Sequence, residues 1–314
     1  MRAATIRDGE VLVADHPDPQ PGHGEVLVRV TAAGVNGADM LQRRGAYPAP
    51  PGSPADIPGL ELAGEVVALG PEATRFTVGD RVMAIVGGGG QAELCAVHER
   101  QAMPVPEAVD AAAAGGLPEV FTTAHDALFS QAGLRMGERV LVSGAAGGVG
   151  TAAIQLAAAA GAHVTASVRN PQLREAVAGL GAHEILDPQD SAEGGPYDVL
   201  LELVGGPDLE ANLRAMNRLG RIVVIGVGAG FKAEVNLLAV MGQRLRIGGS
   251  TLRARPLEEK ADTARAMERE VLPLFERGAL RVPVAETFPL DRVAEAYDRF
   301  AAGGKLGKIV LEIG

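Results

Sequence analysis

The chain has 314 residues, of which 47% are hydrophobic and 22% charged, with a formal net charge of −10. This length suggests about two domains with large buried cores, and the acidic balance argues against a nucleic-acid or anionic-membrane surface, which needs a basic face. No apolar run approaches the roughly 20 residues that span a bilayer. The opening residues lack the apolar core of a signal peptide, so we expect a cytoplasmic protein. The one cysteine, Cys95, excludes an internal disulfide and a thiolate-rich metal site.

Residues 1–115 are typical of an all-β unit. Short strand-like runs alternate with Gly, Pro and Asp turns, which favours a barrel-like fold. The predicted strands are Glu10–Ala14, Glu25–Ala33, Glu65–Leu69 and Arg81–Val86. Tyr47–Pro58 is rich in proline, so we predict a rigid loop outside any sheet interior. The run Gly87–Gly90 is compatible either with a loose loop tip or with backbone that passes close to a ligand.

A helix is predicted to begin in Pro118–Ala127 and to lead into a second domain. His125 in this stretch is more typical of a packed or surface histidine than of a catalytic one. Next comes Arg139–Gly150, in which the apolar run Val140–Val142 predicts a buried strand. A glycine-rich turn follows, and then Thr151–Ala160, whose Ala, Leu, Ile and Gln content predicts a helix.

This strand–turn–helix predicts a dinucleotide site. At Gly147, Gly148 and Val149, missing or small side chains let backbone N–H groups approach a pyrophosphate at a helix N-terminus. Such glycines also occur in any tight turn, so the surrounding pattern decides. Strands and helices alternate downstream, which indicates a doubly wound parallel sheet with its ligand at the carboxyl ends of the strands. The predicted strands are His163–Val168, Glu184–Leu186, Tyr197–Val204, Arg221–Val227 and Leu245–Ser250, and the helices are Pro171–Gly181 and Asp208–Leu219.

The end of the second strand of this sheet favours NADPH over NADH. An NAD site places a carboxylate roughly 20 residues beyond the glycines, to bind the ribose 2′-hydroxyl. This chain has Ser167 and Arg169 there instead, with Arg174 one helical turn further on. A guanidinium suits a 2′-phosphate, which it can bind through two charge-assisted hydrogen bonds. The alternative is that Arg169 is an ordinary solvated surface charge.

Glycines end two further strands, near Val204 and at Gly226 and Val227. Small residues there leave room for the ribose and nicotinamide, although plain turns use glycine as well. The C-terminal part is predicted to contain a long amphipathic helix and then a strand, a helix and a closing strand. These elements are Leu257–Gly278, Val284–Phe288, Leu290–Ala301 and Lys308–Glu312.

Several motifs in order resemble the medium-chain dehydrogenase/reductase superfamily, and within it the zinc-free quinone oxidoreductase branch that includes zeta-crystallin. The resemblance covers essentially the whole chain. It implies a GroES-like β-barrel catalytic domain at residues 1–119 and 257–314, and a Rossmann NADPH-binding domain with a parallel six-stranded sheet at residues 120–256. It also implies a homodimer, formed through the exposed edge of that sheet. The motifs are Gly34–Asp39, Arg44–Pro48, Pro58–Gly64, Val78–Val82, Ala145–Gly150 and Leu306–Leu311.

The chain departs from the zinc-dependent alcohol dehydrogenases of this superfamily. Those relatives supply a zinc cysteine where this chain has Asn36, and a histidine where it has Leu60. Their lobe of clustered cysteines is missing, and the six histidines show no paired spacing. Tetrahedral zinc needs three or four Cys, His or carboxylate ligands, so we predict no metal site. Without a Lewis acid, hydride delivery to an electron-poor acceptor is favoured over alcohol oxidation.

The resemblance also implies roles for individual residues. Asn36 and Tyr47 would lie near the nicotinamide and the acceptor, where Asn36 could hydrogen-bond a carbonyl oxygen that gains negative charge and Tyr47 could do the same or form an aromatic wall. Alternatively, Asn36 holds only a turn and Tyr47 packs only on the proline-rich loop. Water is a candidate proton source, because no residue here is an obvious general acid. Further expected cofactor contacts are Thr123, Ser250, Leu252, Arg253 and Lys308, although Thr123 could be a helix-start residue and Lys308 a surface lysine.

Together these features predict an NADPH-dependent, zinc-independent reductase that transfers hydride to a quinone or a conjugated carbonyl. Its expected partner is a small-molecule substrate, with no nucleic acid and no membrane. An enoyl or acryloyl thioester reductase is the alternative among enzymes. A dinucleotide-binding redox sensor with little turnover is the alternative from another class.

Overall fold

The computed structural model describes residues 1–314, apart from the side chain of Pro207, and divides them into two compact units. The predicted domain boundaries fall close to these divisions but group residues 120–122, 252–256 and 304–307 differently; they stay a prediction. In the part of the chain that is described, no helix has the length and apolar character needed to cross a bilayer. The first unit comprises Met1–Thr122, Leu252–Gly303 and Lys308–Gly314, and the second Thr123–Thr251 and Gly304–Gly307.

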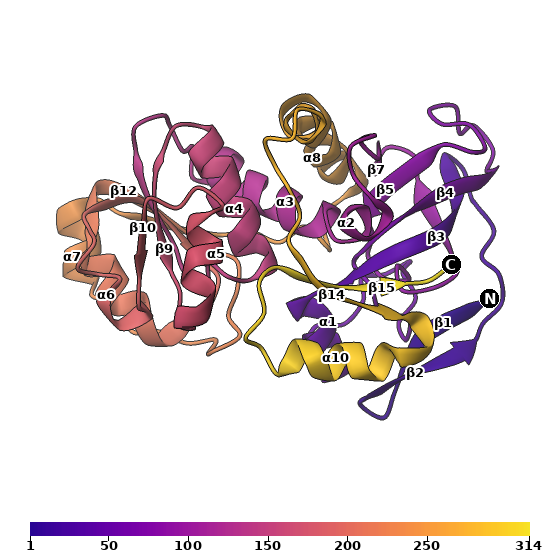
Figure 1. Cartoon of the computed structure of the whole chain (residues 1–314), viewed down its shortest axis with the longest axis horizontal. Coiled ribbons are helices and arrows are strands. Elements are labelled where there is room, and N and C mark those ends of the chain that lie inside the picture. Colours follow the sequence, from indigo (N-terminus) through magenta and orange to yellow (C-terminus); the bar gives the residue numbers. More distant parts are fainter. The chain divides into compact units, whose positions relative to one another are not determined.

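A six-stranded parallel sheet forms the centre of the second unit, which confirms the predicted fold class (Figure 1). The strand of this sheet that comes first in the chain lies inside the sheet, and the later strands are added on both sides of it. Because parallel crossovers are right-handed, the helices that follow the two directions cover opposite faces. In spatial order the strands are β10 (Glu184–Leu186), β9 (His163–Ser167), β8 (Arg139–Val142), β11 (Tyr197–Glu202), β12 (Met216–Val224) and β13 (Arg246–Gly249).

The helices of the second unit pack on apolar side chains of this sheet. Leu141, Leu200 and Ile222 are at most 1% exposed and lie at the middle of adjacent strands. Burial of such residues is the main favourable term in the folding of the unit. The helical segments are α3 (Pro118–His125, shared with the first unit), the π-helical η1 (Asp126–Gln131), α4 (Gly148–Ala159), η2 (Pro171–Leu173), α5 (Arg174–Ala178), η3 (Pro188–Asp190), η4 (Gly206–Asp208), α6 (Leu209–Arg214) and α7 (Leu237–Gln243).

The first unit is built on a mainly antiparallel seven-stranded sheet. Its order is β14 (Val284–Pro289), β15 (Lys308–Glu312), β3 (Glu25–Val35), β4 (Glu61–Leu69), β5 (Arg81–Ile85) and β7 (Ala102–Pro104), with β6 (Leu94–His98) also paired to β3. β1 (Arg2–Arg7) and β2 (Glu10–Asp15) form a separate hairpin. The closing strand β15 therefore lies against an N-terminal strand. The helices are α1 (Gly37–Arg43), α2 (Ala111–Gly115), α8 (Leu257–Glu270), α9 (Leu272–Glu276), η5 (Leu290–Arg292) and α10 (Val293–Ala301).

Two predicted helices are shorter than their sequence pattern. The helix expected over 257–278 breaks at Val271, because Pro273 lacks a backbone donor and its ring excludes a continuous helix. The helix expected over 208–219 ends at Arg214, because β12 begins at Met216, where sheet pairing with Tyr197 overrides helix propensity. β1, β6, β7, α1, α2 and α7 were not predicted from the sequence, because they are short or lack a clear period.

The four-glycine run is not a loose tip. Gly87–Gly90 is buried, and it packs against the proline-rich loop and the start of β4. A Cβ on Gly87 would overlap Ser53 Oγ, and one on Gly90 would lie 2.7 Å from the carbonyl oxygen of Glu61. Glycine is therefore needed at Gly87 and Gly90, where a Cβ would meet neighbouring atoms too closely.

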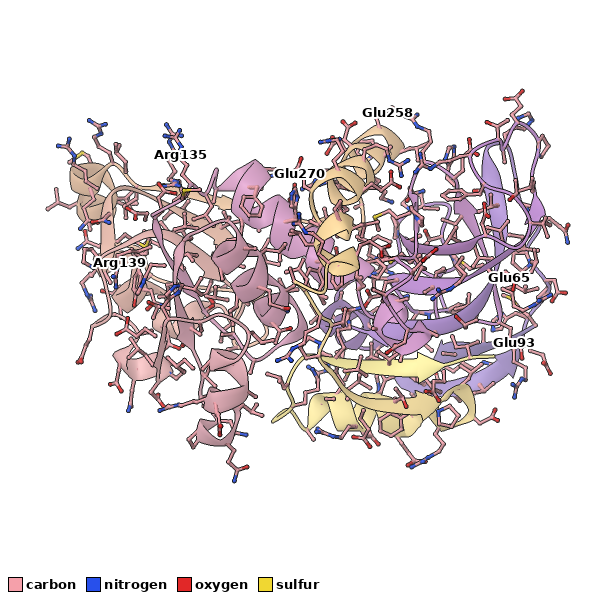
Figure 2. All side chains as sticks on the ribbon, turned by 45° about the horizontal axis from the view of Figure 1, so that its top comes forward. Glu65, Glu93, Arg135, Arg139, Glu258 and Glu270 are labelled. Atoms are coloured by element: carbon pink, nitrogen blue, oxygen red, sulfur yellow. The ribbon has the colours of Figure 1, made fainter. Side chains whose placement is uncertain are left out.

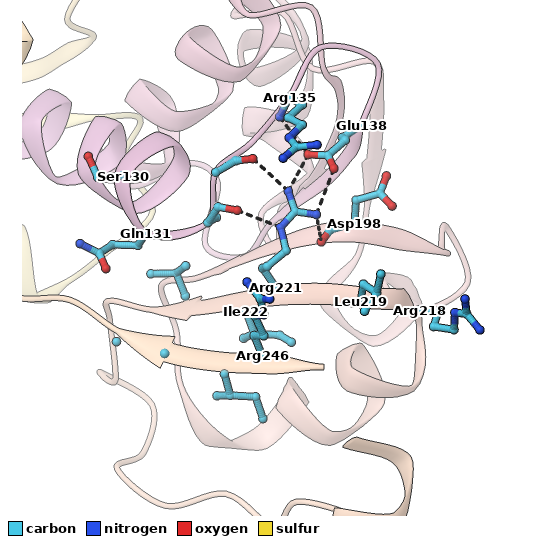
Figure 3. Close-up of a pocket in the computed structure, with 16 residues that line it drawn as sticks. Ser130, Gln131, Arg135, Glu138, Asp198, Arg218, Leu219, Arg221, Ile222 and Arg246 are labelled. Carbon is cyan, nitrogen blue, oxygen red and sulfur yellow. Dashed lines mark hydrogen bonds and ion pairs between the residues drawn. The ribbon is translucent and has the colours of Figure 1, made fainter. Parts of the chain in front are cut away.

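Arg221 ties together the ends of several elements in the second unit (Figure 3). Its guanidinium pairs with Glu138 at 2.6 Å and donates to the carbonyl oxygens of Ala132, Gly133 and Asp198. The side chains of Arg221 and Glu138 are 19% and 22% exposed, so water screens the pair only partly. They border a hollow of about 610 Å³.

Replacing Arg221 should therefore destabilise the protein. We expect Arg221→Ala to lower the free energy of unfolding by about 2 kcal/mol, because it removes the ion-pair partner of Glu138 and the guanidinium donor of two loop carbonyls. Urea unfolding followed by circular dichroism measures this change. Arg218→Ala is the matched control, since Arg218 is exposed and lines the same hollow. Equal effects of the two substitutions would contradict the role of Arg221.

Candidate functional site

The glycine-rich turn in the second unit leaves a helix N-terminus open for an anion. Gly147 is the N-cap of α4 and supplies no side-chain cap, so the first N–H groups of the helix, at Gly148 and Val149, lack an intrahelical acceptor. A Cβ on Gly150 would lie 2.6 Å from the carbonyl oxygen of Gly144, so the turn needs glycine there. The turn is held by Gly307, whose N–H donates to the carbonyl of Ala146 at 2.8 Å. These residues fit a dinucleotide pyrophosphate.

The end of β9 presents one arginine that is not engaged by the protein. Ser167 is 4% exposed, and its carbonyl accepts the N–H of Ala145 in the glycine-rich turn. Arg169 is exposed and forms no ion pair among the described residues. Arg174, by contrast, pairs with Asp187 at 3.1 Å. Of the two arginines, Arg169 is the one that can take up a phosphate group.

Glu202, which the sequence analysis missed, organises the turns at the middle of this edge. One carboxylate oxygen accepts hydrogen bonds from Ser143 Oγ at 2.7 Å and from the N–H groups of Val204 and Gly205 at 2.7 and 2.9 Å. Ser143 follows β8 directly and Gly205 follows β11, so this buried carboxylate joins the ends of two adjacent strands. The other oxygen, Oε2, is buried without a hydrogen-bond partner among the described residues. In the sequence, Glu202 could have been recognised as a functional residue because it is a carboxylate at the end of an apolar strand.

The glycine after β12 has a packing reason of its own. A Cβ on Gly226 would overlap the carbonyl oxygen of Leu203, so the strand ends of β11 and β12 can approach only with glycine here. Val204 and Val227 border this close approach. The parallel topology thus brings these residues to the same carboxyl edge as the glycine-rich turn.

Two other expected cofactor contacts lie within the second unit. Thr123 is 7% exposed on α3. Ser250 follows β13, and its hydroxyl donates to Asp126 Oδ2 at 2.6 Å. Asp126 begins the π-helical turn η1 and is 3% exposed. Ser250 is therefore fixed by a buried carboxylate that the sequence analysis did not single out.

A buried ion pair in the first unit surrounds Asn36. Lys308 Nζ lies 2.6 Å from Glu61 Oε1 and 2.6 Å from Asn36 Oδ1, and it also donates to the carbonyl of Val35 at 3.1 Å. Asn36 Nδ2 donates to the same Glu61 oxygen at 2.8 Å. Lys308 and Glu61 side chains are 2% and 0% exposed, so the expectation of a surface lysine is wrong. A Cβ on Gly34 would lie 2.9 Å from Lys308 Nζ, so glycine there makes room for the pair.

Asn36 also begins helix α1, as the turn-holding alternative required. Its backbone N–H donates to Asp39 Oδ2 at 2.8 Å, and its carbonyl accepts the N–H of Asp39 at 3.1 Å. The backbone therefore holds the turn, which leaves the amide side chain for Glu61 and Lys308. Asp39 also accepts the N–H of Gly59 at 3.1 Å. Burial raises the pKa of Asp39 to about 6, against the lowering effect of these two N–H groups.

Arg253 is buried in the first unit, where it holds Tyr47. Its guanidinium donates to the carbonyls of Gly87 and Tyr47 at 2.7 and 2.9 Å and to Gln42 Oε1 at 2.6 Å. It also lies over the Tyr47 ring, 5.1 Å from the centroid. Arg253 is 2% exposed and its neighbour Leu252 6%. The structure thus brings together a residue expected at the acceptor and one expected at the cofactor, and it ties both to the proline-rich and four-glycine loops.

The donor set around Asn36 does not fit zinc. The positions at which the zinc-dependent relatives supply cysteine and histidine hold Asn36 and Leu60, and the nearby cation is the Lys308 ammonium, which already occupies Glu61 and Asn36. Across the described residues, no group of three or more His, Cys, Asp or Glu side chains is placed to hold a metal ion. A second cation here would be repelled by Lys308.

Comparison with known proteins assigns the family. The model of the alcohol dehydrogenase GroES-like domain matches residues 22–129, and that of the zinc-binding dehydrogenase domain matches residues 180–311. A quinone oxidoreductase of Pseudomonas aeruginosa is 34% identical over 95% of this chain and 94% of its own length.

Solved structures agree with this assignment. An alcohol dehydrogenase superfamily protein from Novosphingobium aromaticivorans superposes with a TM-score of 0.88 at 33% identity, over 100% of both chains. A mycobacterial protein complexed with NADPH superposes with a TM-score of 0.87 at 26% identity, over 99% of this chain and 100% of that one. These likenesses confirm a GroES-like domain joined to a Rossmann domain, and the chain belongs to the quinone oxidoreductase family of the medium-chain dehydrogenase/reductase superfamily.

Proposed function

We propose that the protein is an NADPH-dependent, zinc-independent reductase that transfers hydride to a quinone or a conjugated carbonyl. The observation that carries the proposal is the carboxyl edge of the second unit. An open helix N-terminus follows β8 there, and β9 is followed by the exposed Arg169, which forms no ion pair within the described part of the chain. The quinone oxidoreductase relatives support the acceptor class, and the NADPH complex of a structural neighbour supports the cofactor.

The residues of this edge have distinct tasks in binding the cofactor. The N–H groups at Gly148 and Val149 bind the pyrophosphate, assisted by the positive end of the α4 dipole. Arg169 binds the 2′-phosphate, and Ser167 adds a neutral hydrogen bond. Glu202 keeps the turns after β8 and β11 in place. When bound, the cofactor supplies the hydride.

The acceptor is polarised by groups of the first unit. Asn36 uses one hydrogen of its amide on Glu61, and its orientation is fixed because Lys308 can only donate. The second amide hydrogen remains to bind a carbonyl oxygen that gains negative charge. Tyr47, held by Arg253, provides a hydroxyl and a ring face. A fixed amide and a phenol thus replace a metal ion as the electrophilic groups.

Turnover tests the proposed activity directly. We expect protein freed of metal by a chelator to oxidise NADPH in the presence of an aromatic ortho-quinone, at the same rate as untreated protein and faster than it oxidises NADH. The rate is measured as the decrease in absorbance of the reduced cofactor. Activity that requires added zinc would contradict the metal-free site, and NADPH binding without consumption across quinones and enones would contradict the reductase.

Arg169→Ala should separate the two cofactors. Loss of charge-assisted hydrogen bonds of about 1.5 to 3 kcal/mol predicts that NADPH binds roughly 10- to 150-fold more weakly, with NADH binding nearly unchanged. Titration calorimetry of the purified variants gives both dissociation constants. Arg174→Ala is the matched control, because Arg174 is already paired with Asp187. Equal losses for NADPH and NADH would refute the 2′-phosphate assignment.

The free edge of the six-stranded sheet supports a homodimer. β13 ends the sheet, and all four of its residues are exposed, so their backbone can pair with the same strand of a second copy. Near it along the chain, α7 exposes apolar side chains at Leu237, Leu238 and Met241. A patch of this kind is typical of a self-complementary interface.

Solution mass tests the dimer. Light scattering after gel filtration should give twice the 32.2 kDa chain mass for the wild type. The double substitution Leu238→Glu and Met241→Glu should shift the protein to the monomer, because it places charges in the apolar patch. Val78→Glu, at an exposed apolar residue of the first unit, should leave the mass unchanged. A monomeric wild type would overturn this proposal.

A further inference from the structure

Glu119 places a second carboxyl group against the Glu61–Lys308 pair. It is the second residue of α3, and its backbone N–H donates to Glu61 Oε2 at 2.8 Å. One oxygen of its own carboxyl, Oε2, is inaccessible to solvent and has no hydrogen-bond partner among the described residues. An ionised carboxylate in this position would be left partly unsolvated and unpaired, which is costly.

The charges around Glu119 favour its neutral form. The groups that act on it are Glu61, Asp39, Lys308 and Arg253. Lys308 is already bound by Glu61 and Asn36, and Arg253 by three acceptors of the loops. Burial, followed by repulsion from Glu61, raises the pKa of Glu119 to about 8.

The half-buried side chain of Glu119 belongs to the cluster of residues proposed to hold the acceptor. Asn36 and Glu119 bind the two oxygens of the same Glu61 carboxylate, Asn36 through its amide and Glu119 through its backbone N–H. Tyr47 interacts electrostatically with both Glu119 and Arg253, and burial is the main cause of its own raised pKa. Two hydrogen-bond donors and one held proton thus belong to a single polar cluster of the first unit.

We propose that the Glu119 carboxyl is the proton donor of the reduction, an assignment that rests on the proposed function. The hydride and its electron pair reduce the acceptor, and the negative charge collects on the acceptor as an enolate or a phenolate. The Glu119 O–H bond then breaks and its proton forms the new bond to that anion. The carboxylate recovers a proton from water, so each turnover oxidises one reduced cofactor and consumes one proton.

The pH dependence of turnover tests this assignment. In the wild type, kcat should fall as pH rises through about 8, as Glu119 loses its proton. Glu119→Gln keeps the size and neutrality of the side chain but carries no acidic proton, so kcat should fall on the order of 10²-fold and lose this basic limb. Glu65→Gln is the matched control, an exposed glutamate on β4 that Figure 2 labels, and it should keep the wild-type rate and profile.

Thermal unfolding of the cofactor-free protein supplies a reading independent of turnover. The pKa of Glu119 is raised from 4.5 to about 8 in the folded state. Its contribution to the stability of the folded protein is therefore fully present below about pH 4.5 and is lost as pH rises through about 8. The melting temperature of the wild type should therefore fall, relative to that of Glu119→Gln, across this window. A difference in melting temperature between the two proteins that does not change with pH would contradict the proposal that folded Glu119 keeps its proton.

The outcomes separate the two proposals. A wild type that reduces quinones, with a Glu119→Gln variant that keeps both the rate and the basic limb, refutes the proton donor and leaves the proposed function standing. A wild type that consumes no NADPH with any quinone or enone refutes the proposed function, and the donor role with it. Loss of the basic limb only in Glu119→Gln supports both.

Discussion

The buried ion pair between Lys308 and Glu61 is the constraint on which the first unit depends. Taking two charges out of water costs several kcal/mol per ion, and their attraction compensates only when the remaining donors and acceptors are satisfied. Here Asn36, the carbonyl of Val35 and the N–H of Glu119 complete the set. Because β4 and β15 both pair with β3, the pair joins the closing strand to the N-terminal sheet.

The same pair sets the chemistry of its surroundings. The charge of Lys308 is already paired with the Glu61 carboxylate. Its attraction lowers the pKa of the neighbouring acids Asp39 and Glu119 less than burial raises it. Asp39 accepts hydrogen bonds from two N–H groups, whereas one oxygen of the Glu119 carboxyl has no partner among the described residues. A fixed cation therefore orients Asn36, and burial raises the pKa of the Glu119 carboxyl in the same cluster. At the positions where the resemblance places the zinc ligands of other relatives, this chain has Asn36 and Leu60, and the cation bound to Asn36 is the Lys308 ammonium.

In the second unit, a buried carboxylate has an analogous ordering role. Glu202 binds Ser143 and the N–H groups after β11, which fixes the two strand ends that flank the point where the strand order reverses. Dinucleotide sites lie at this point in parallel sheets. The glycines at 150 and 226 are needed for backbone approach there, so the turn geometry follows from packing as much as from any ligand.

Local pattern in the sequence determined the alternating strands and helices and the glycine-rich turn before α4, because each depends on residues close together in the chain. The missing zinc ligands at Asn36 and Leu60 were recognised from the family resemblance. Helix ends at Arg214 and Val271 were placed wrongly, since sheet pairing and a proline decided them. Only the tertiary structure put Lys308 beside Glu61 and Arg253 over Tyr47. It also left one carboxyl oxygen of Glu119 buried without a hydrogen-bond partner among the described residues. These contacts join residues far apart in sequence, and burial and charge pairing, which set their chemistry, exist only once the chain has folded.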